Sequence, residues 1–143
     1  MYKNILIATD GSDLSKEAVA HGLALAKAVV ARVTIVTAHS PLYSQMSLVE
    51  KDLPAIERHE LGQARARLEA IVDTATVMGL VCDPVLVTGK FPYEGIVETA
   101  NAKGCDLIVM ASHGWRGISA VLLGSEAQKV LTHSKIPVLI HRR

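Results

Sequence analysis

The sequence predicts a single α/β domain, an open parallel sheet of five strands with helices on both faces. Short runs rich in β-forming residues alternate with longer helical patterns, as in a parallel sheet covered by crossover helices. The short runs are continuously apolar, as expected of strands buried on both faces. The chain has 143 residues, 50% of them hydrophobic, which supports one core and is too short for two ordinary domains.

The predicted strands are the apolar runs that lie between segments of helical or turn composition. They are Asn4 to Thr9, Val33 to His39, Asp83 to Thr88, Asp106 to Ala111 and Pro137 to His141. No internal repeat or linker divides the chain, so we expect one domain over residues 1–143.

The first helix is predicted between the first two strands, with Ser12 or Asp13 as its N-cap. Small and apolar residues recur along it at steps of three and four: Leu14, Ala18, Gly22, Leu25 and Val29. We expect Gly22 to let this helix lie close to the sheet, because glycine has no Cβ.

Proline and glycine bound the other three predicted helices. Their spans are Pro54 to Met78 with Gly79 just past the end, Pro92 to a stop at Gly104, and the neighbourhood of Gly124 and Ser125 to just before Pro137. The last of them carries Ala127, Val130 and Leu131. The irregular segment 40–53 could be a ligand lid, a partner surface or simply a loose connection, and the sequence leaves all three open.

Charge and composition exclude several classes of function. Fifteen basic and fourteen acidic residues give a net charge of +1 with no run of one sign, so we expect neither nucleic-acid nor membrane binding. The apolar run from Ile5 to Ala8 is too short for a signal peptide and that from Leu23 to Ala31 is too short for a membrane span, which predicts a cytoplasmic protein. The two cysteines, Cys82 and Cys105, lack metal or redox spacing.

Two strand ends carry residues suited to ligand binding, since ligands of open parallel sheets bind beyond the carboxyl ends of the strands. Thr9-Asp10-Gly11-Ser12 follows the first strand, and the fourth ends at Ala111 before a glycine-containing loop that leads to Gly124 and Ser125. Glycines let the backbone approach a phosphate, and a helix N-terminus offers free N–H groups. There is no Walker lysine motif, and no Gly-x-Gly-x-x-Gly follows the first strand.

Along its whole length the chain resembles the universal stress protein family. The resemblance rests on four blocks: residues 5–12, 31–36, 105–114 and 136–140. The ATP-binding branch of that family carries Gly-x2-Gly-x9-Gly-Ser/Thr. Here the spacing is kept as Ala111-x2-Gly114-x9-Gly124-Ser125, with alanine in place of the first glycine.

The resemblance implies a universal stress protein domain over residues 1–143 with a Rossmann-like sheet of order 3-2-1-4-5. It further implies ATP with magnesium or manganese as cofactor, and a homodimer that pairs through the last strand. An exposed apolar edge strand needs such a cover on physical grounds too. The nucleotide-binding residues carried over from the family are Ala8, Thr9, Asp10, Ala38, Met110, Ala111, His113, Gly114, Gly117, Gly124, Ser125, Glu126 and Ala127.

Several of these residues have a second interpretation. Asp10 and Ser12 suit a turn and a helix cap, and His113 suits a loop position that holds backbone geometry. Glu126 favours the helix dipole but repels phosphate if its carboxylate turns inward, so it either points to solvent or lowers affinity. The remaining histidines, which lack metal spacing, are interpreted as surface or packing residues: His21, His39, His59, His133 and His141.

Three functions are compatible with this pattern. The first is a stress-associated ATP-binding protein that reports or uses nucleotide state with at most slow hydrolysis, since the candidate loops hold few groups for phosphoryl transfer. The second is a nucleotide-free dimeric module that binds a protein partner. The third, weaker because the first loop lacks Ser-Gly-Gly, is an adenylating enzyme of the ATP-pyrophosphatase type.

Overall fold

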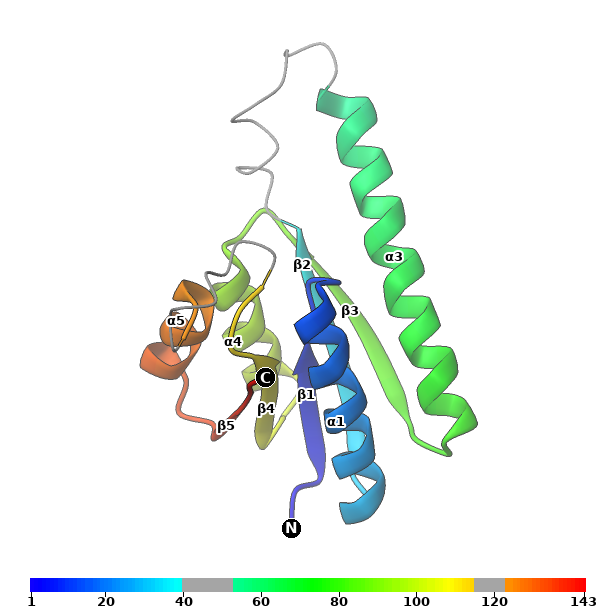
Figure 1. Cartoon of the computed structure of the whole chain (residues 1–143), viewed down its shortest axis with the longest axis vertical. Helices are drawn as coiled ribbons and strands as arrows, with labels where there is room; N and C mark the ends of the chain where they lie inside the picture. Colours follow the sequence, from blue (N-terminus) through cyan, green and yellow to red (C-terminus); the bar gives the residue numbers. More distant parts are fainter. Residues whose placement is uncertain (40–52, 115–122) are drawn as a thin grey trace.

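The computed structural model describes residues 1–39, 53–114 and 123–143 and contains one parallel sheet in the order β3-β2-β1-β4-β5 (Figure 1). The strands are β1 (Asn4–Ala8), β2 (Arg32–His39), β3 (Cys82–Thr88), β4 (Leu107–Ala111) and β5 (Val138–His141). The helices are α1 (Asp13–Val29), α3 (Leu53–Val77), α4 (Pro92–Ala102) and α5 (Ser125–His133). The predicted fold class and strand order are confirmed, with strand ends differing by a residue at several places.

Helices cover the two faces of the sheet in pairs, α1 and α3 on one and α4 and α5 on the other (Figure 1). Alternate residues of β1 therefore enter different cores: Ile5 and Ile7 pack toward α1 and α3, while Leu6 and Ala8 pack toward α4 and α5. The prediction of strands buried on both faces holds for β1 and β4. It is wrong for β3 and β5, which are only half-buried because they form the edges of the sheet.

The predicted helix ends agree closely with the structure. Ser12 is the N-cap of α1, and its side chain accepts a hydrogen bond from the N–H of Ser15 at 3.3 Å. Gly79, just past α3, has φ +84°, which glycine adopts without strain. Leu131 is an exception to the predicted apolar face of α5, because its side chain turns away from the core and is 43% exposed.

Gly22 brings α1 close to the sheet as predicted. A Cβ built on it would lie 2.7 Å from Cδ1 of Ile7. The end of α1 was not predicted: Val30 is its C-cap and has the left-handed conformation, at φ 59°.

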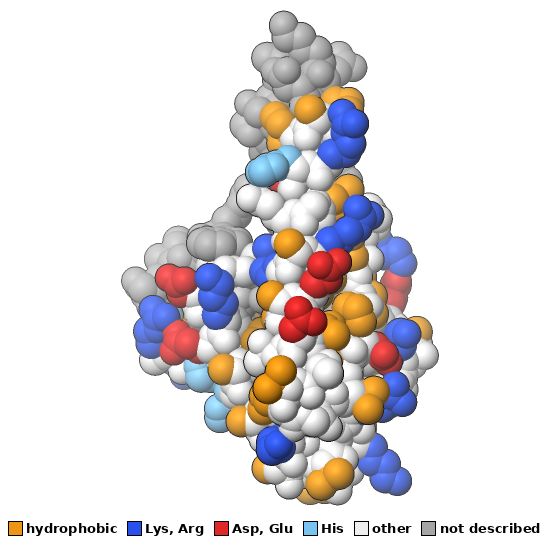
Figure 2. Space-filling view, turned by 90° about the vertical axis from the view of Figure 1, so that its right-hand side faces the viewer, with side chains coloured by type: hydrophobic (Ala, Val, Ile, Leu, Met, Phe, Trp, Pro, Cys, Tyr) orange, Lys and Arg blue, Asp and Glu red, His pale blue; other side chains and the backbone are white. Residues whose placement is uncertain are grey.

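In the described part of the chain, no helix is long and apolar enough to cross a membrane. The face shown in Figure 2 carries acidic and basic side chains interspersed rather than gathered by sign.

Candidate functional site

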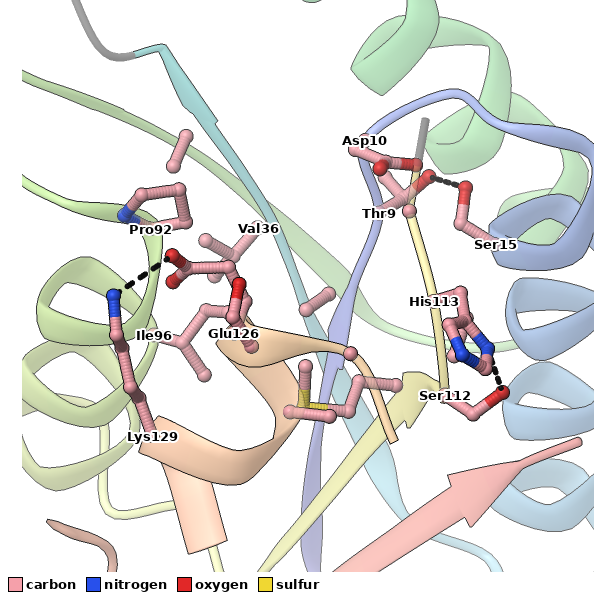
Figure 3. A pocket seen from close by; sticks show the side chains of 18 of the residues that line it. Thr9, Asp10, Ser15, Val36, Pro92, Ile96, Ser112, His113, Glu126 and Lys129 are labelled. Carbon is pink, nitrogen blue, oxygen red and sulfur yellow. Dashed lines mark hydrogen bonds and ion pairs between the residues drawn. The ribbon is translucent and has the colours of Figure 1, made fainter. Parts of the chain in front are cut away.

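A pocket of about 1000 Å³ opens at the carboxyl ends of β1, β2 and β4 (Figure 3). Among the residues that line it are all the sequence-predicted site residues except Gly117, which lies outside the described residues. They are Ala8, Thr9, Asp10, Ala38, Met110, Ala111, His113, Gly114, Gly124, Ser125, Glu126 and Ala127. The fold thus brings four separate parts of the sequence, 8–10, 38, 110–114 and 124–127, into one cavity. Their role in binding a nucleotide stays a prediction.

Side chains of the β1–α1 loop build the turn that bounds the pocket. Asp10 Oδ1 accepts a hydrogen bond from the N–H of Ser12 at 2.9 Å, and the N–H of Gly11 donates to Thr9 Oγ1 at 3.2 Å. The hydroxyls of Thr9 and Ser15 lie 3.0 Å apart (Figure 3). The turn and cap interpretation of Asp10 and Ser12 is therefore confirmed, and Asp10 lines the pocket at the same time.

The N-terminus of α5 also lines the pocket. Its N-cap is Gly124, and within the described residues no side chain caps its first turn, in contrast to α1. The N–H of Gly124 donates to the Ser112 carbonyl at 2.6 Å, and a Cβ on Gly124 would lie 2.9 Å from that oxygen. A Cβ on Gly114 would collide with the carboxylate of Asp10. Gly114 thus lets the segment after β4 lie against the β1–α1 loop, and Gly124 lets the start of α5 lie against the end of β4. The first-turn N–H groups of α5 remain available for an anion.

Glu126 lines the pocket with its side chain 28% exposed, and both of its carboxylate oxygens are engaged by neighbours. Its effect on phosphate affinity stays a prediction. One carboxylate oxygen accepts a hydrogen bond from the N–H of Tyr93 in the first turn of α4 at 2.9 Å. The other lies 3.7 Å from Nζ of Lys129, the contact drawn in Figure 3. The carboxylate therefore accepts a hydrogen bond from a first-turn N–H group of α4, and the positive end of that helix dipole stabilises its charge. This contact links α5 to α4.

His113 has one engaged ring nitrogen and one available ring nitrogen. Nδ1 lies 3.0 Å from the hydroxyl of Ser112 (Figure 3). Nε2 is buried and has no hydrogen-bond partner among the described residues. Since buried polar atoms are normally paired, an unpaired nitrogen in the wall of a pocket points to a ligand atom as its partner. The ring is thus held through Nδ1 by the side chain of Ser112, and Nε2 is left for a ligand. The backbone-holding interpretation of His113 stays a prediction.

The structure adds a polar wall that the sequence interpretation missed, made of His39 at the end of β2 and of Glu60 and Arg67 on α3. His39, which was predicted to be a surface or packing residue, is mostly buried at 13% exposure and also lines the pocket. Its Nδ1 lies 3.5 Å from Glu60 Oε2. One sequence feature could have pointed to Arg67: it lies on the same face of the helix as Ala64 and next to Leu68. Both of these residues are buried in the structure.

Arg67 ties α3 to the strand ends beneath it. Its Nη2 donates to Thr37 Oγ1 at 3.0 Å, and that hydroxyl donates to the Thr9 carbonyl at 2.7 Å. A Cβ on Gly11 would lie 2.8 Å from Nη1, so the guanidinium lies directly against the β1–α1 loop. Burial lowers the pKa of Arg67 and the nearby Asp10 carboxylate opposes that shift, so the side chain stays a cation.

The family model described as the universal stress protein family matches residues 1–142. The chain belongs to that family. A universal stress protein of Thermus aquaticus is 37% identical over 145 residues, covering 99% of this chain and 100% of the relative. The structure of MJ0577, a universal stress protein of Methanocaldococcus jannaschii, superposes with a TM-score of 0.90 at 29% identity and covers 100% of this chain and 97% of its own.

A solved universal stress protein in complex with cAMP is also similar to this chain. It is 30% identical with a TM-score of 0.72, and the match covers 97% of this chain and 96% of the other.

In the present universal stress protein, Ala111 is the last residue of β4 and is buried. Within residues 1–39, 53–114 and 123–143, no group of three or more His, Cys, Asp or Glu side chains could hold a metal ion.

Proposed function

We propose that this universal stress protein binds ATP, together with Mg²⁺ or Mn²⁺, and acts as a nucleotide-dependent regulator in the stress response. The observation that carries the proposal is the first turn of α5, which lines the pocket with no side-chain cap from the described residues. Free N–H groups and the positive end of a helix dipole together favour a phosphate. The Ser125 hydroxyl adds a donor at the same place.

The rest of the pocket suits the nucleoside. Val36, Ala38, Ile96 and Met110 give an aliphatic wall on the α4 and α5 side of the sheet, against which a planar base fits. The cavity lies within the range of volumes that hold small-molecule ligands. The similarity to a universal stress protein that binds cAMP supports an adenine nucleotide as the ligand class.

Magnesium or manganese fits this site as a partner of the phosphates. Mg²⁺ is commonly held by substrate phosphates, waters and one or two carboxylates rather than by a cage of protein ligands. Asp10 lines the pocket and supplies one carboxylate. When bound, the ion would neutralise phosphate charge. Lys129 is the lysine among the described lining residues, and Glu126 holds it, so few cations assist phosphoryl transfer and hydrolysis is at most slow.

A homodimer through β5 is part of the proposal. β5 lies at one edge of the sheet, next to β4, and its side chains from Val138 to His141 are half-buried. A half-buried apolar edge strand offers unpaired backbone groups to a second copy. Sedimentation analysis of the wild type and of Leu139→Lys would show a loss of dimer in the variant.

The first experiment is to denature freshly purified protein and identify any released nucleotide. The stripped protein is then titrated calorimetrically with ATP, ADP and AMP in the presence of Mg²⁺. We expect saturable binding of ATP at one site per chain. No released nucleotide and no binding heat would overturn the proposal and favour the nucleotide-free interaction module.

A pair of variants at Ser125 then tests the phosphate position. Ser125→Asp puts a negative charge into the first turn of α5, which favours the helix but repels phosphate, so affinity should fall more than about tenfold without loss of stability. Ser125→Asn is the neutral control of the same size. Equal ATP affinity in both variants would contradict the phosphate site. Gly124 is less suitable, because any Cβ there would press on the Ser112 carbonyl.

A further inference from the structure

The guanidinium of Arg67 lies on the face of the sheet that α1 and α3 cover. Its Nη2 donates to Thr37 Oγ1 at 3.0 Å, and Thr37 stands two residues after Ile35 on β2. Ile35 belongs to the core beneath α1 and α3, whereas Val36 belongs to the core on the other face. Because side chains alternate along a strand, Thr37 shares the face of Ile35. Arg67 therefore lines the pocket from the side opposite the aliphatic wall proposed for the base.

The hydroxyl of Thr37 connects Arg67 to the β1–α1 loop. A guanidinium offers only donors, so Thr37 Oγ1 accepts from Arg67 and directs its own proton to another partner. That partner is the Thr9 carbonyl, with the two oxygens 2.7 Å apart. The N–H of Thr9 donates to the Val36 carbonyl at 2.9 Å. Both backbone groups of Thr9 are thus tied to β2, and the next residue along the chain is Asp10.

The guanidinium also contacts the loop just beyond Asp10. Gly11 has φ +83°, and a Cβ on it would lie 2.8 Å from Arg67 Nη1. Any other residue would clash there, so glycine lets the backbone and the guanidinium meet. Arg67 therefore supports the loop on both sides of Asp10, through Thr37 before it and at Gly11 after it.

The carboxylate of Asp10 carries this support to the ligand side of the pocket. Its Oδ1 accepts a hydrogen bond from the N–H of Ser12 at 2.9 Å, and a Cβ on Gly114 would collide with its Oδ2. Gly114 stands two residues after Ser112, whose carbonyl accepts the N–H of Gly124 at the start of α5. The carboxylate is therefore held beside the segment that borders the proposed phosphate site.

We propose that Arg67 is a positioning residue: it fixes the Asp10 carboxylate toward a bound nucleotide and its metal ion without touching the ligand itself. This inference rests on the proposed nucleotide site. A loop that is already ordered loses less freedom when a ligand binds, so the support from Arg67 strengthens binding. The inference gives α3 a role in a site whose sequence-predicted residues all lie outside that helix.

The experiment is a calorimetric titration of the full chain with ATP and Mg²⁺ in wild type, Arg67→Met, Asp10→Asn and the double variant. Asp10→Asn removes the charge and keeps an oxygen for the Ser12 N–H. Each single variant should weaken ATP binding by about tenfold. The double variant should bind like Asp10→Asn alone, because Arg67 acts only through Asp10. Arg65→Met, exposed on α3, is the matched control and should bind like wild type.

A pair of substitutions at Thr37 tests the connection between Arg67 and the loop. Thr37→Ser keeps the hydroxyl and both of its hydrogen bonds, so ATP affinity should stay within about threefold of wild type. Thr37→Val has a similar shape but no hydroxyl, which leaves the Thr9 carbonyl without this donor. It should therefore reproduce the loss seen in Arg67→Met.

The outcomes separate this inference from the proposed function. Additive losses in the double variant would overturn the inference, because Arg67 would then contact the ligand directly or act on the fold as a whole. Wild-type affinity in either Arg67→Met or Asp10→Asn would overturn it as well, while nucleotide binding would stand. A wild type that binds no ATP overturns both proposals. Thermal melting establishes that each variant is folded, and if Arg67→Met does not fold, Thr37→Val with and without Asp10→Asn decides.

Discussion

Replacing glycine by alanine should have different effects on stability in two helices, because only one of the two glycines touches the sheet. Gly22 in α1 is buried, and an added Cβ would lie 2.7 Å from Cδ1 and 2.9 Å from Cγ1 of Ile7. Ile7 is fully buried in β1 and has little room to move. Gly62 in α3 has no atom within 4 Å of its added Cβ. Gly62→Ala is therefore the matched control for Gly22→Ala.

The magnitudes follow from two terms. Alanine is about 1 kcal/mol better than glycine inside a helix, and this gain applies at both positions. Overpacking a buried site costs about 1–3 kcal/mol, and this cost applies only at Gly22. For a chain of this size, 1 kcal/mol corresponds to about 2–4 °C in melting temperature. Gly62→Ala should raise the melting temperature by that amount, and Gly22→Ala should melt at least about 2–4 °C below it.

Thermal unfolding followed by circular dichroism, with chemical denaturation to obtain free energies of unfolding, measures both variants. Equal stabilisation by the two substitutions would refute the reasoning, because it would mean that α1 moves away from the sheet at no cost. Stabilisation by Gly62→Ala alone would confirm that the close approach at Gly22 is a real packing constraint.

Three further predictions concern sites away from the pocket. Val30→Gly should stabilise the protein by about 0.5–1 kcal/mol in a denaturant titration. Val30 is 89% exposed and has a left-handed backbone, so the substitution removes backbone strain and little packing; a less stable variant would contradict this. Burial, with a smaller effect of Asp83, raises the pKa of the Cys82 thiol from 9.0 to about 11. At pH 8, alkylation of Cys82 should therefore be about a hundredfold slower in the folded protein than in the unfolded chain, and equal rates would refute the raised pKa. The Arg143 hydrogen bond lowers the pKa of Glu17, so the pair stabilises the fold above the unfolded pKa and the effect is lost as pH falls through the folded one. Arg143→Ala should raise the Glu17 pKa in an NMR titration, and an unchanged value would count against the pair.

Local patterns were sufficient to predict the elements of this fold. The N-cap at Ser12, the proline at the start of α4 and the glycine after α3 each act within a few residues of the element they bound. Continuous apolar runs marked every strand, because central strands of a parallel sheet are covered on both faces. The partial exposure of β3 and β5 was missed, since the sequence of a strand does not say whether a neighbour lies beyond it.

The candidate site divides in the same way. The Gly114 and Gly124 spacing was identified through the resemblance to the family motif, and the residues after β1 through their place at the carboxyl end of a strand. Only the tertiary structure decided that Glu126 turns to α4 and that Arg67 and His39 enter the pocket. Those contacts join residues at least 21 positions apart, His39 with Glu60, Arg67 with Thr37 and Glu126 with Tyr93. They depend on how the helices pack against the whole core. The sequence around a charged helix residue is the same whether its side chain faces solvent, the end of another helix or a ligand cavity. Only the packed structure distinguishes these three cases.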